Sequence, residues 1–212
     1  MPQVLLADWI AAVQAGELVS FPTDTVPALA AQPAAGERIY QAKQRSATKP
    51  LILMGASLAD LLPYVGGTEA GVAQWAEVAQ AHWPGALTLV LPASDRLPPA
   101  MNPDQTGTLG IRVPNHPLAR YVLERTGPLA TTSANRSGSP ALEAMAAIEA
   151  AFPEAFTLAP AALKEIYSAL IGMPPPPADQ PQGSGLPSTV ARWQGQGWEI
   201  LRQGAVILNV KD

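Results

Sequence analysis

The chain has 212 residues, of which 48% are hydrophobic and only 14% charged, a composition that excludes an intrinsically disordered protein. It contains no cysteine, which excludes disulfides, thiol nucleophiles, iron–sulfur clusters and cysteine-ligated zinc. The formal net charge of −4 argues against a general polyanion binder, since such proteins are usually basic overall. Any site for an anion must therefore be local.

The length predicts a single domain over residues 1–212, because domains hold roughly 150 residues. The first basic residue is Arg38, so the N-terminus lacks the charged start of a signal or transit peptide. Proline, glycine or a charged residue interrupts every apolar run before it reaches the roughly 20 residues that span a bilayer. We therefore expect a cytoplasmic protein that makes no contact with a membrane.

Helices and strands alternate along the first half of the chain. Apolar residues at helical spacing, followed by Gly16, predict a helix over residues 4–15, and Pro22 ends a short strand over 18–21. Two more strands are predicted over 51–54 and 87–91, and three more helices over 37–44, after Ser57 and after Thr68. Serine and threonine are typical N-cap residues, which sets the start of the last two helices.

The alternation continues through the second half. Predicted strands cover 108–113, 129–132, 188–193, 198–202 and 205–210, and predicted helices cover 118–124, 140–151 and about 161–169. Residues 173–185 are rich in proline and glycine and predict an exposed, mobile loop. The fold class predicted from this order is mixed α/β, with a twisted sheet flanked by helices.

The usual catalytic groups are scarce. Neither of the two histidines, His82 and His116, has a nucleophile and an acidic partner near it in the sequence, so a catalytic triad could arise only through the fold. We interpret His116 as a turn residue that satisfies backbone groups. No group of His, Asp and Glu has metal-ligand spacing, so a substrate should hold much of any metal that is used.

The basic residues are more informative. Four of the thirteen fall within a twelve-residue stretch that contains no acid: Arg38, Lys43, Arg45 and Lys49. This stretch is either a solvated helix end, where cations meet the macrodipole, or an anion site that the following apolar strand holds in place. Arg112 and Arg202 each lie in an otherwise apolar strand, and each is either half of a structural ion pair or a forked donor for phosphate or carboxylate.

Two turns of small polar residues, 131–138 and 183–190, offer hydroxyls and open amides that can cradle an oxyanion. Each turn alone also fits an ordinary loop. Neither common phosphate-binding motif, G-x-x-x-x-G-K-[ST] or G-x-G-x-x-G after a strand, occurs in the chain. Together with the basic stretch, the turns predict a nucleotide-sized anion pocket outside the common phosphate-binding folds.

Seven short segments complete this pattern, in the order 21–25 (FPTDT), 43–51 (KQRSATKPL), 83–88 (WPGALT), 112–117 (RVPNHP), 133–138 (SANRSG), 187–190 (PSTV) and 201–204 (LRQG). They resemble, over almost the whole chain, the motif blocks of the YrdC-like threonylcarbamoyl-adenylate synthases. The resemblance implies a YrdC-like twisted, mixed, open sheet with a concave ligand cleft.

The resemblance also implies a reaction, in which L-threonine, bicarbonate or CO2 and ATP give threonylcarbamoyl-AMP and pyrophosphate. This is the first step of the threonylcarbamoyladenosine modification of tRNA, and the product would pass to a tRNA threonylcarbamoyl transferase complex. The carboxylated amine of threonine would attack the α-phosphate, which agrees with the missing triad. Mg2+, held mainly by the ATP phosphates, would assist.

Motif positions imply which residues bind which substrate. The implied threonine-binding residues are Thr25, Arg112, Ser133 and Ser188. The implied ATP-binding residues are Lys43, Arg45, Lys49, Asn135 and Arg202, of which Lys43 and Arg45 would contact the phosphates and carry the catalysis. Thr108 joins the ATP set because it lies four residues before Arg112 and so, by alternation, on the same strand face.

The segment Val26-Pro27-Ala28 departs from the family pattern, which has an aromatic residue and then glycine. Pro27 removes an amide and Ala28 adds a methyl group, so a changed pocket is expected. Two alternatives stay open: an RNA-binding module that uses the same basic cleft, which the acidic net charge disfavours, and a paralogue of the same fold with altered or lost activity. Residues 152–185 are a candidate lid over the cleft.

Overall fold

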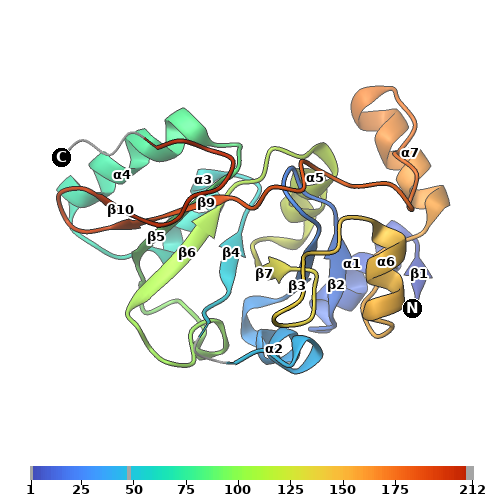
Figure 1. Ribbon diagram of the computed structural model, residues 1–212, viewed down its shortest axis with the longest axis horizontal. Helices are drawn as coiled ribbons and strands as arrows, with labels where there is room; N and C mark the ends of the chain where they lie inside the picture. Colours follow the sequence, from blue (N-terminus) through green and yellow to red (C-terminus); the bar gives the residue numbers. More distant parts are fainter. Residues whose placement is uncertain (1, 47–48, 209–212) are drawn as a thin grey trace.

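The computed structural model of the chain describes residues 2–46 and 49–208. Its centre is an eight-stranded sheet in the order β10-β9-β5-β6-β4-β7-β3-β2 (Figure 1). The strands are β2 Val19–Phe21, β3 Ala28–Ala31, β4 Ile52–Met54, β5 Leu87–Pro92, β6 Thr108–Arg112, β7 Leu129–Ser133, β9 Thr189–Trp193 and β10 Trp198–Arg202. The β4–β6 and β5–β9 pairs are parallel and the other neighbours are antiparallel, which confirms the mixed sheet.

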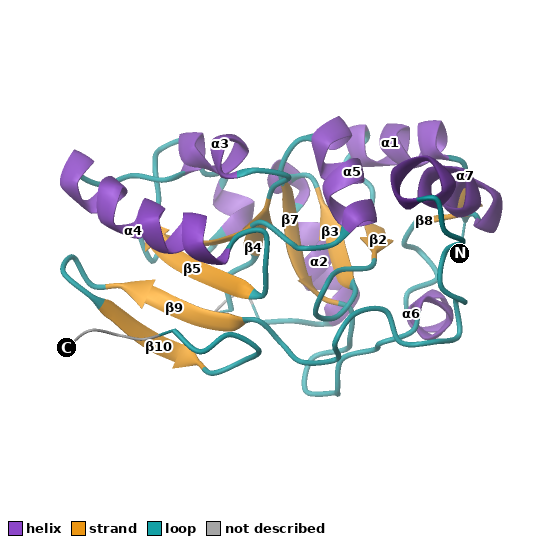
Figure 2. Ribbon diagram, turned by 90° about the horizontal axis from the view of Figure 1, so that it is seen from above, coloured by secondary structure: helices purple, strands orange, loops and turns teal. Residues whose placement is uncertain are grey.

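Helices flank this sheet. They are α1 Leu6–Gln14, α2 Glu37–Lys43, α3 Leu58–Leu61, α4 Glu69–His82, α5 Pro117–Thr126, α6 Met145–Ala151 and α7 Pro160–Ile171. In Figure 2, α3 and α4 lie along the half of the sheet that contains β5, while α1, α5 and α7 gather at the other end, near β2. A separate parallel pair, β1 Gln3–Val4 with β8 Thr157–Leu158, lies at that same end.

Local capping accounts for several of the helix starts. The Ser57 side chain accepts a hydrogen bond from the Asp60 amide and the Asp60 carboxylate accepts one from the Ser57 amide, which makes a capping box for α3. Thr68 accepts from the Gly71 amide at the start of α4. These caps confirm the two predicted helix starts, and His116 caps α5 in the same way, because its Nδ1 accepts from the Ala119 amide at 3.3 Å.

Two predicted elements differ from the structure. The helix predicted from residue 140 begins only at Met145, because the Leu142 amide donates to the Ala134 carbonyl outside any helix and Ala144 is extended. The strand predicted over 205–210 is absent from its described part, residues 205–208, where the Ala205 amide donates to the Pro187 carbonyl and the Val206 amide to the Thr189 hydroxyl. Residues 209–210 lie outside the described residues.

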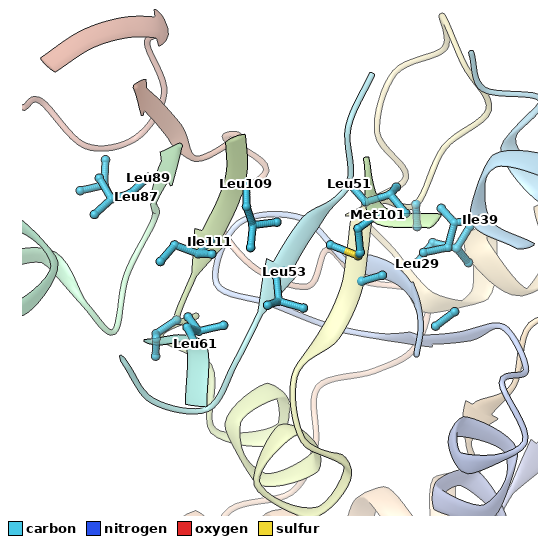
Figure 3. Packing of buried hydrophobic residues seen from close by; sticks show 14 of the residues in the cluster. Leu29, Ile39, Leu51, Leu53, Leu61, Leu87, Leu89, Met101, Leu109 and Ile111 are labelled. Carbon is cyan, nitrogen blue, oxygen red and sulfur yellow. The ribbon is translucent and has the colours of Figure 1, made fainter. Parts of the chain in front are cut away.

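Strand alternation separates the core from the site. Leu109 and Ile111 of β6 point into the larger hydrophobic cluster, together with Leu53 of β4 and residues of β5 (Figure 3). The alternate residues of β6, which are Thr108, Gly110 and Arg112, therefore face the other side of the sheet. A second cluster covers the β2 end of the sheet, where Trp9 of α1 meets Phe21 edge-on at 6.1 Å between ring centroids.

The central position of Leu53 generates a stability prediction. Strand β4 lies between β6 and β7, and the Leu53 side chain is fully buried in the larger hydrophobic cluster. Leu53→Ala therefore leaves a cavity and should lower the free energy of unfolding by about 2–5 kcal/mol. The matched control is Leu170→Ala on α7, where the side chain is 40% exposed and the expected change is within about 0.5 kcal/mol. Urea unfolding followed by circular dichroism measures both, and equal losses in the two variants would contradict this description of the core.

Candidate active site

The sheet face opposite the larger core cluster opens on two adjoining cavities that share Ile52. The smaller, of about 70 Å3, is surrounded by residues of several strands and turns: Thr25, Met54, Arg112, Ser133, Ser188 and Arg202 are among them. One water needs about 10–15 Å3 on this measure, so this cavity admits several waters or a small polar molecule. The larger cavity, of about 330 Å3 over β5, β6 and β9, is within the size range of small-molecule sites.

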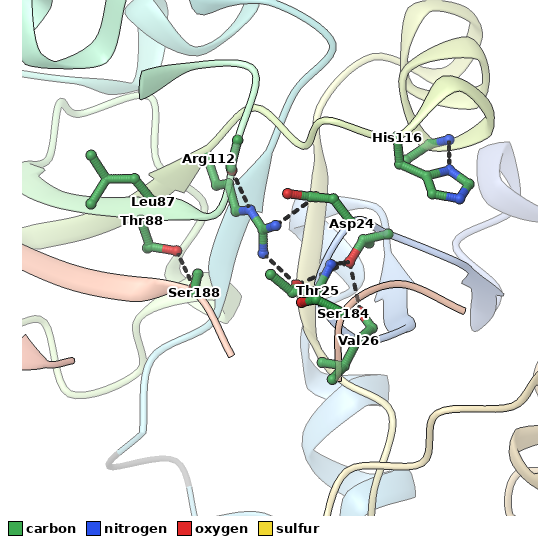
Figure 4. Close-up of polar contacts among 12 residues, drawn as sticks. Asp24, Thr25, Val26, Leu87, Thr88, Arg112, His116, Ser184 and Ser188 are labelled. Atoms are coloured by element: carbon green, nitrogen blue, oxygen red, sulfur yellow. Dashed lines mark hydrogen bonds and ion pairs between the residues drawn. The ribbon is translucent and has the colours of Figure 1, made fainter. Parts of the chain in front are cut away.

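Arg112 links two separated parts of the chain at the smaller cavity (Figure 4). From the end of β6, its Nη2 donates to Asp24 Oδ1 at 2.6 Å, its Nη1 to Thr25 Oγ1 at 2.8 Å and its Nε to the Gly85 carbonyl at 3.0 Å. The residue is only 4% exposed. Burial lowers the pKa of Arg112, and the negative charge of Asp24 opposes that shift. Arg112 is thus both a buried ion-pair partner and part of the cavity wall.

The turn between β2 and β3 holds the two partners of Arg112. Thr23 Oγ1 accepts a hydrogen bond from the Thr25 amide at 3.2 Å and donates to the Val26 carbonyl at 2.7 Å. Both threonines are buried, and their hydroxyl oxygens lie 3.1 Å apart. Side-chain to backbone bonds of this kind fix the shape of a turn. The Thr25 hydroxyl therefore has a set position in the cavity wall.

A second cationic group approaches the cavity from β10. Arg202 Nη2 donates to the Ser188 carbonyl at 2.8 Å and to the Ser188 hydroxyl at 3.2 Å. That hydroxyl also lies 2.9 Å from Thr88 Oγ1 (Figure 4). The positive charge of Arg202 contributes to lowering the pKa of Arg112, so the two guanidinium groups repel each other across the cavity. An anion placed between them would relieve this repulsion.

Lys43, at the end of α2, is almost completely buried at 1% exposure. Its Nζ donates to the Ser133 carbonyl and, at 3.0 Å, to Asn135 Oδ1, which also accepts from the Ser133 hydroxyl at 2.6 Å. Burial, together with a smaller contribution from the nearby charge of Arg45, lowers the pKa of the Lys43 ammonium from 10.5 to about 7. Lys43 is thus a buried amine, not a solvated helix end, and it reaches the cavity wall through Ser133.

The other predicted ATP residues lie at different distances from this centre. Thr108 lines the larger cavity and shares a 3.1 Å hydrogen bond with the Thr106 hydroxyl. Arg45 donates to the Lys49 carbonyl at 3.1 Å and to the Pro50 carbonyl at 3.4 Å, which braces the loop before β4. The Lys49 side chain is exposed. Within the part of the chain that the structure describes, neither Arg45 nor Lys49 lines the two cavities.

Two further residues of the site carry no assignment from the sequence: Asp24 provides the ion-pair partner of Arg112, and Thr88 contacts Ser188. Ala28, where the sequence predicts a changed pocket, lines the smaller cavity. Asp24 lies in the FPTDT segment, which singles out this turn without showing where the carboxylate points. His116 belongs to the cap of α5, and burial lowers its pKa to about 4.

Among residues 2–46 and 49–208, no group of three or more His, Asp or Glu side chains could hold a metal ion. The same residues form no helix with both the length and the apolar character needed to cross a bilayer.

Comparison with known proteins identifies the family. The sequence model of the Sua5/YciO/YrdC family, described as "Telomere recombination", matches residues 11–168. The chain belongs to this family. It is 38% identical to the threonylcarbamoyl-AMP synthase of Chromohalobacter salexigens over 74% of this chain and 85% of that protein. It is 32% identical to the synthase of the same name from Klebsiella pneumoniae, over 81% of this chain and 95% of that protein.

Solved structures of the Sua5/YciO/YrdC family share the fold. P. abyssi Sua5 complexed with L-threonine superposes with a TM-score of 0.75 at 29% identity, over 94% of this chain and 54% of that chain. The present chain therefore spans about half the length of that Sua5 structure. E. coli YciO superposes with a TM-score of 0.75 over 96% of this chain and 91% of that chain, and at 20% identity it supports the fold alone.

The burial of Lys43 generates a pH prediction. Between about pH 7 and 10.5, the unfolded chain binds a proton at Lys43 that the folded chain has largely released, so this residue makes the free energy of unfolding rise with pH. Lys43→Met removes the titrating group while keeping much of the volume. The stability of the wild type relative to this variant should therefore increase across that window, by at most about 1.4 kcal/mol per pH unit.

Urea unfolding at a series of pH values measures this difference. The control is Lys164→Met on α7, which removes an exposed lysine outside the site. A difference between wild type and Lys43→Met that stays constant from pH 7 to 10 would show that Lys43 keeps its proton in the folded protein.

Proposed function

We propose that this protein is a threonylcarbamoyl-AMP synthase, which joins L-threonine, bicarbonate or CO2 and ATP to give threonylcarbamoyl-AMP and pyrophosphate. The observation that carries the proposal is the smaller cavity, where two arginines from distant strands meet three hydroxyl groups: those of Thr25, Ser133 and Ser188. The relatives named threonylcarbamoyl-AMP synthase and the fold shared with the threonine complex of Sua5 support the same activity.

The smaller cavity is the proposed threonine site. Guanidinium groups are suited to a carboxylate, and Arg112 and Arg202 both lie in its wall. The hydroxyls of Thr25, Ser133 and Ser188 can bond the remaining polar groups of the amino acid. Val26, Ala28 and Met54 supply an apolar wall for a short side chain, since they line the same cavity.

The larger cavity is the proposed nucleotide site. Its wall joins apolar side chains of the sheet to the hydroxyls of Thr88, Thr106 and Thr108, a composition that suits a base and a ribose. The phosphates would then point toward the boundary of the two cavities, near Arg202, with Lys43 and Arg45 as further cations. A phosphate beside Lys43 would raise its pKa again and favour the charged amine.

In the proposed reaction the substrates supply the reacting groups. The threonine amine adds to CO2 and loses a proton to form a carbamate, and a carbamate oxygen attacks the α-phosphorus while pyrophosphate leaves. The protein positions the carbamate and the phosphate, and its cations stabilise the charge that develops at phosphorus. ATP enters as its Mg2+ complex, in which the metal ion neutralises charge on the phosphate oxygens. Lys43 and Arg45 would do the same from the protein side.

The product of this reaction is a mixed anhydride, which another enzyme must consume. We propose that it passes to a tRNA threonylcarbamoyl transferase complex, and that the protein works in the cytoplasm together with that complex. A paralogue with altered activity is the second candidate, and the Ala28 methyl group in the cavity wall is the observation that favours it. Direct RNA binding is the weaker alternative, because the net charge is −4.

The activity prediction uses the purified chain with ATP, labelled threonine, bicarbonate and Mg2+. The wild type should release pyrophosphate and form the adenylate, which chromatography detects. Lys43→Ala and Arg45→Ala should each lower the rate by at least about 100-fold, since each removes a cation proposed to stabilise the transition state. Lys164→Ala, on an exposed face of α7, is the control and should keep the wild-type rate.

Circular dichroism and thermal unfolding check that the variants fold. Full activity in a folded Lys43→Ala protein would contradict the assignment of Lys43. A wild type that binds ATP and threonine without forming the adenylate would favour the paralogue, and submicromolar RNA binding that weakens steeply with salt would favour the RNA-binding module.

A further inference from the structure

The long connection from α7 to β9 crosses the molecule and meets the turn that holds the partners of Arg112 (Figure 1). We call residues 182–185 of this connection the strap. Sequence composition predicts only an exposed loop here, and most of residues 173–185 are exposed. The strap itself is fixed by backbone contacts at both of its ends.

At the site end, the strap pairs with the backbone of the two residues whose side chains bind Arg112. The Ser184 amide donates to the Asp24 carbonyl at 3.1 Å, and the Gly185 amide donates to the Thr25 carbonyl at 2.9 Å. Figure 4 shows Ser184 beside this turn, with the Arg112 fork on the other side of it. The turn is therefore held from two directions.

This pairing requires glycine at position 183. The Gly183 φ angle is +98°, which L side chains rarely adopt. A Cβ atom at this position would lie 2.4 Å from the Thr23 carbonyl oxygen and 2.6 Å from that of Thr25. Both atoms belong to the backbone, so they cannot move aside as a flexible side chain would. A methyl group at position 183 must therefore displace the strap, the turn or both.

At its other end, the strap is anchored away from the site. The Gln182 amide donates to the Glu143 carbonyl at 2.7 Å. The Gln182 side chain, only 5% exposed, donates from Nε2 to the Pro177 and Gln180 carbonyls at 3.0 and 3.1 Å. Beyond the strap, Leu186 leads into Pro187 and Ser188, which line the smaller cavity.

We propose that Gly183 is a positioning residue for the amino-acid substrate. By allowing the strap to lie against the turn, it fixes the backbone of Asp24 and Thr25, and these two side chains set the orientation of the Arg112 fork in the smaller cavity. The inference rests on the proposed function, because it assigns the smaller cavity to the amino acid and not to the nucleotide.

The test compares steady-state kinetics of Gly183→Ala with those of the wild type. Because a misplacement of about 1 Å can cost roughly 100-fold, the KM for threonine should rise by at least about tenfold, while the KM for ATP and the kcat change by less than about threefold. The matched control is Gly195→Ala in the β9–β10 hairpin. Gly195 has a similar φ of +92°, and an added Cβ there meets nothing within 4 Å, so all constants should stay near wild-type values.

A second variant decides the case in which Gly183→Ala does not fold. Gln182→Ala removes the side-chain hydrogen bonds of the far anchor to the Pro177 and Gln180 carbonyls, while the backbone bond to Glu143 remains. This looser anchor does not touch the wall of the smaller cavity and should raise the KM for threonine about threefold, with the KM for ATP unchanged. An unchanged KM for threonine in folded Gly183→Ala, or in Gln182→Ala if the first variant unfolds, would overturn the inference alone. A wild type that makes no adenylate would overturn the proposed function and the inference with it.

Discussion

The buried ion pair between Arg112 and Asp24 connects the two halves of the candidate site. Its partners are 88 positions apart in the sequence, one at the end of β6 and the other in the turn after β2. Removing one partner of such a pair typically costs about 3–5 kcal/mol, because the other charge is left buried and unpaired. The pair therefore constrains where β6 ends, how the turn lies and where Thr25 presents its hydroxyl.

The sheet makes this arrangement possible because it uses its two faces differently. Leucine and isoleucine of β5 and β6, with Leu53 of β4, fill one face, and alternate positions of β5 and β6 carry threonine, glycine and arginine to the cavities. Arg202 then adds positive charge from the β10 edge, and Lys43, at the end of α2, adds it when its amine is protonated. An acidic chain can thus concentrate cations at one place, which is what a local anion site requires.

Local signals in the sequence predict much of this fold, and contacts between distant segments explain what they miss. The caps at Ser57 and Thr68 are predictable because a cap depends on neighbouring residues. Strand β3 is not predictable from local signals, because Ala28–Ala31 is buried on both faces and shows no alternation of apolar and polar residues. The motifs single out Arg112 and Ser188, but neither the pairing with Asp24 nor the docking of the strap has a signal in the sequence, because each depends on tertiary contacts.

The most direct test of the account is a double-mutant cycle on threonine affinity, measured by calorimetry with Asp24→Asn, Arg112→Met and the double variant. If the pair acts as one unit that shapes the amino-acid site, each single substitution should weaken threonine binding. The double variant should then bind threonine little less tightly than the single variant with the lower affinity, which corresponds to a coupling energy above about 1 kcal/mol. Losses that add to within about 0.5 kcal/mol would contradict the claim that the ion pair organises the site.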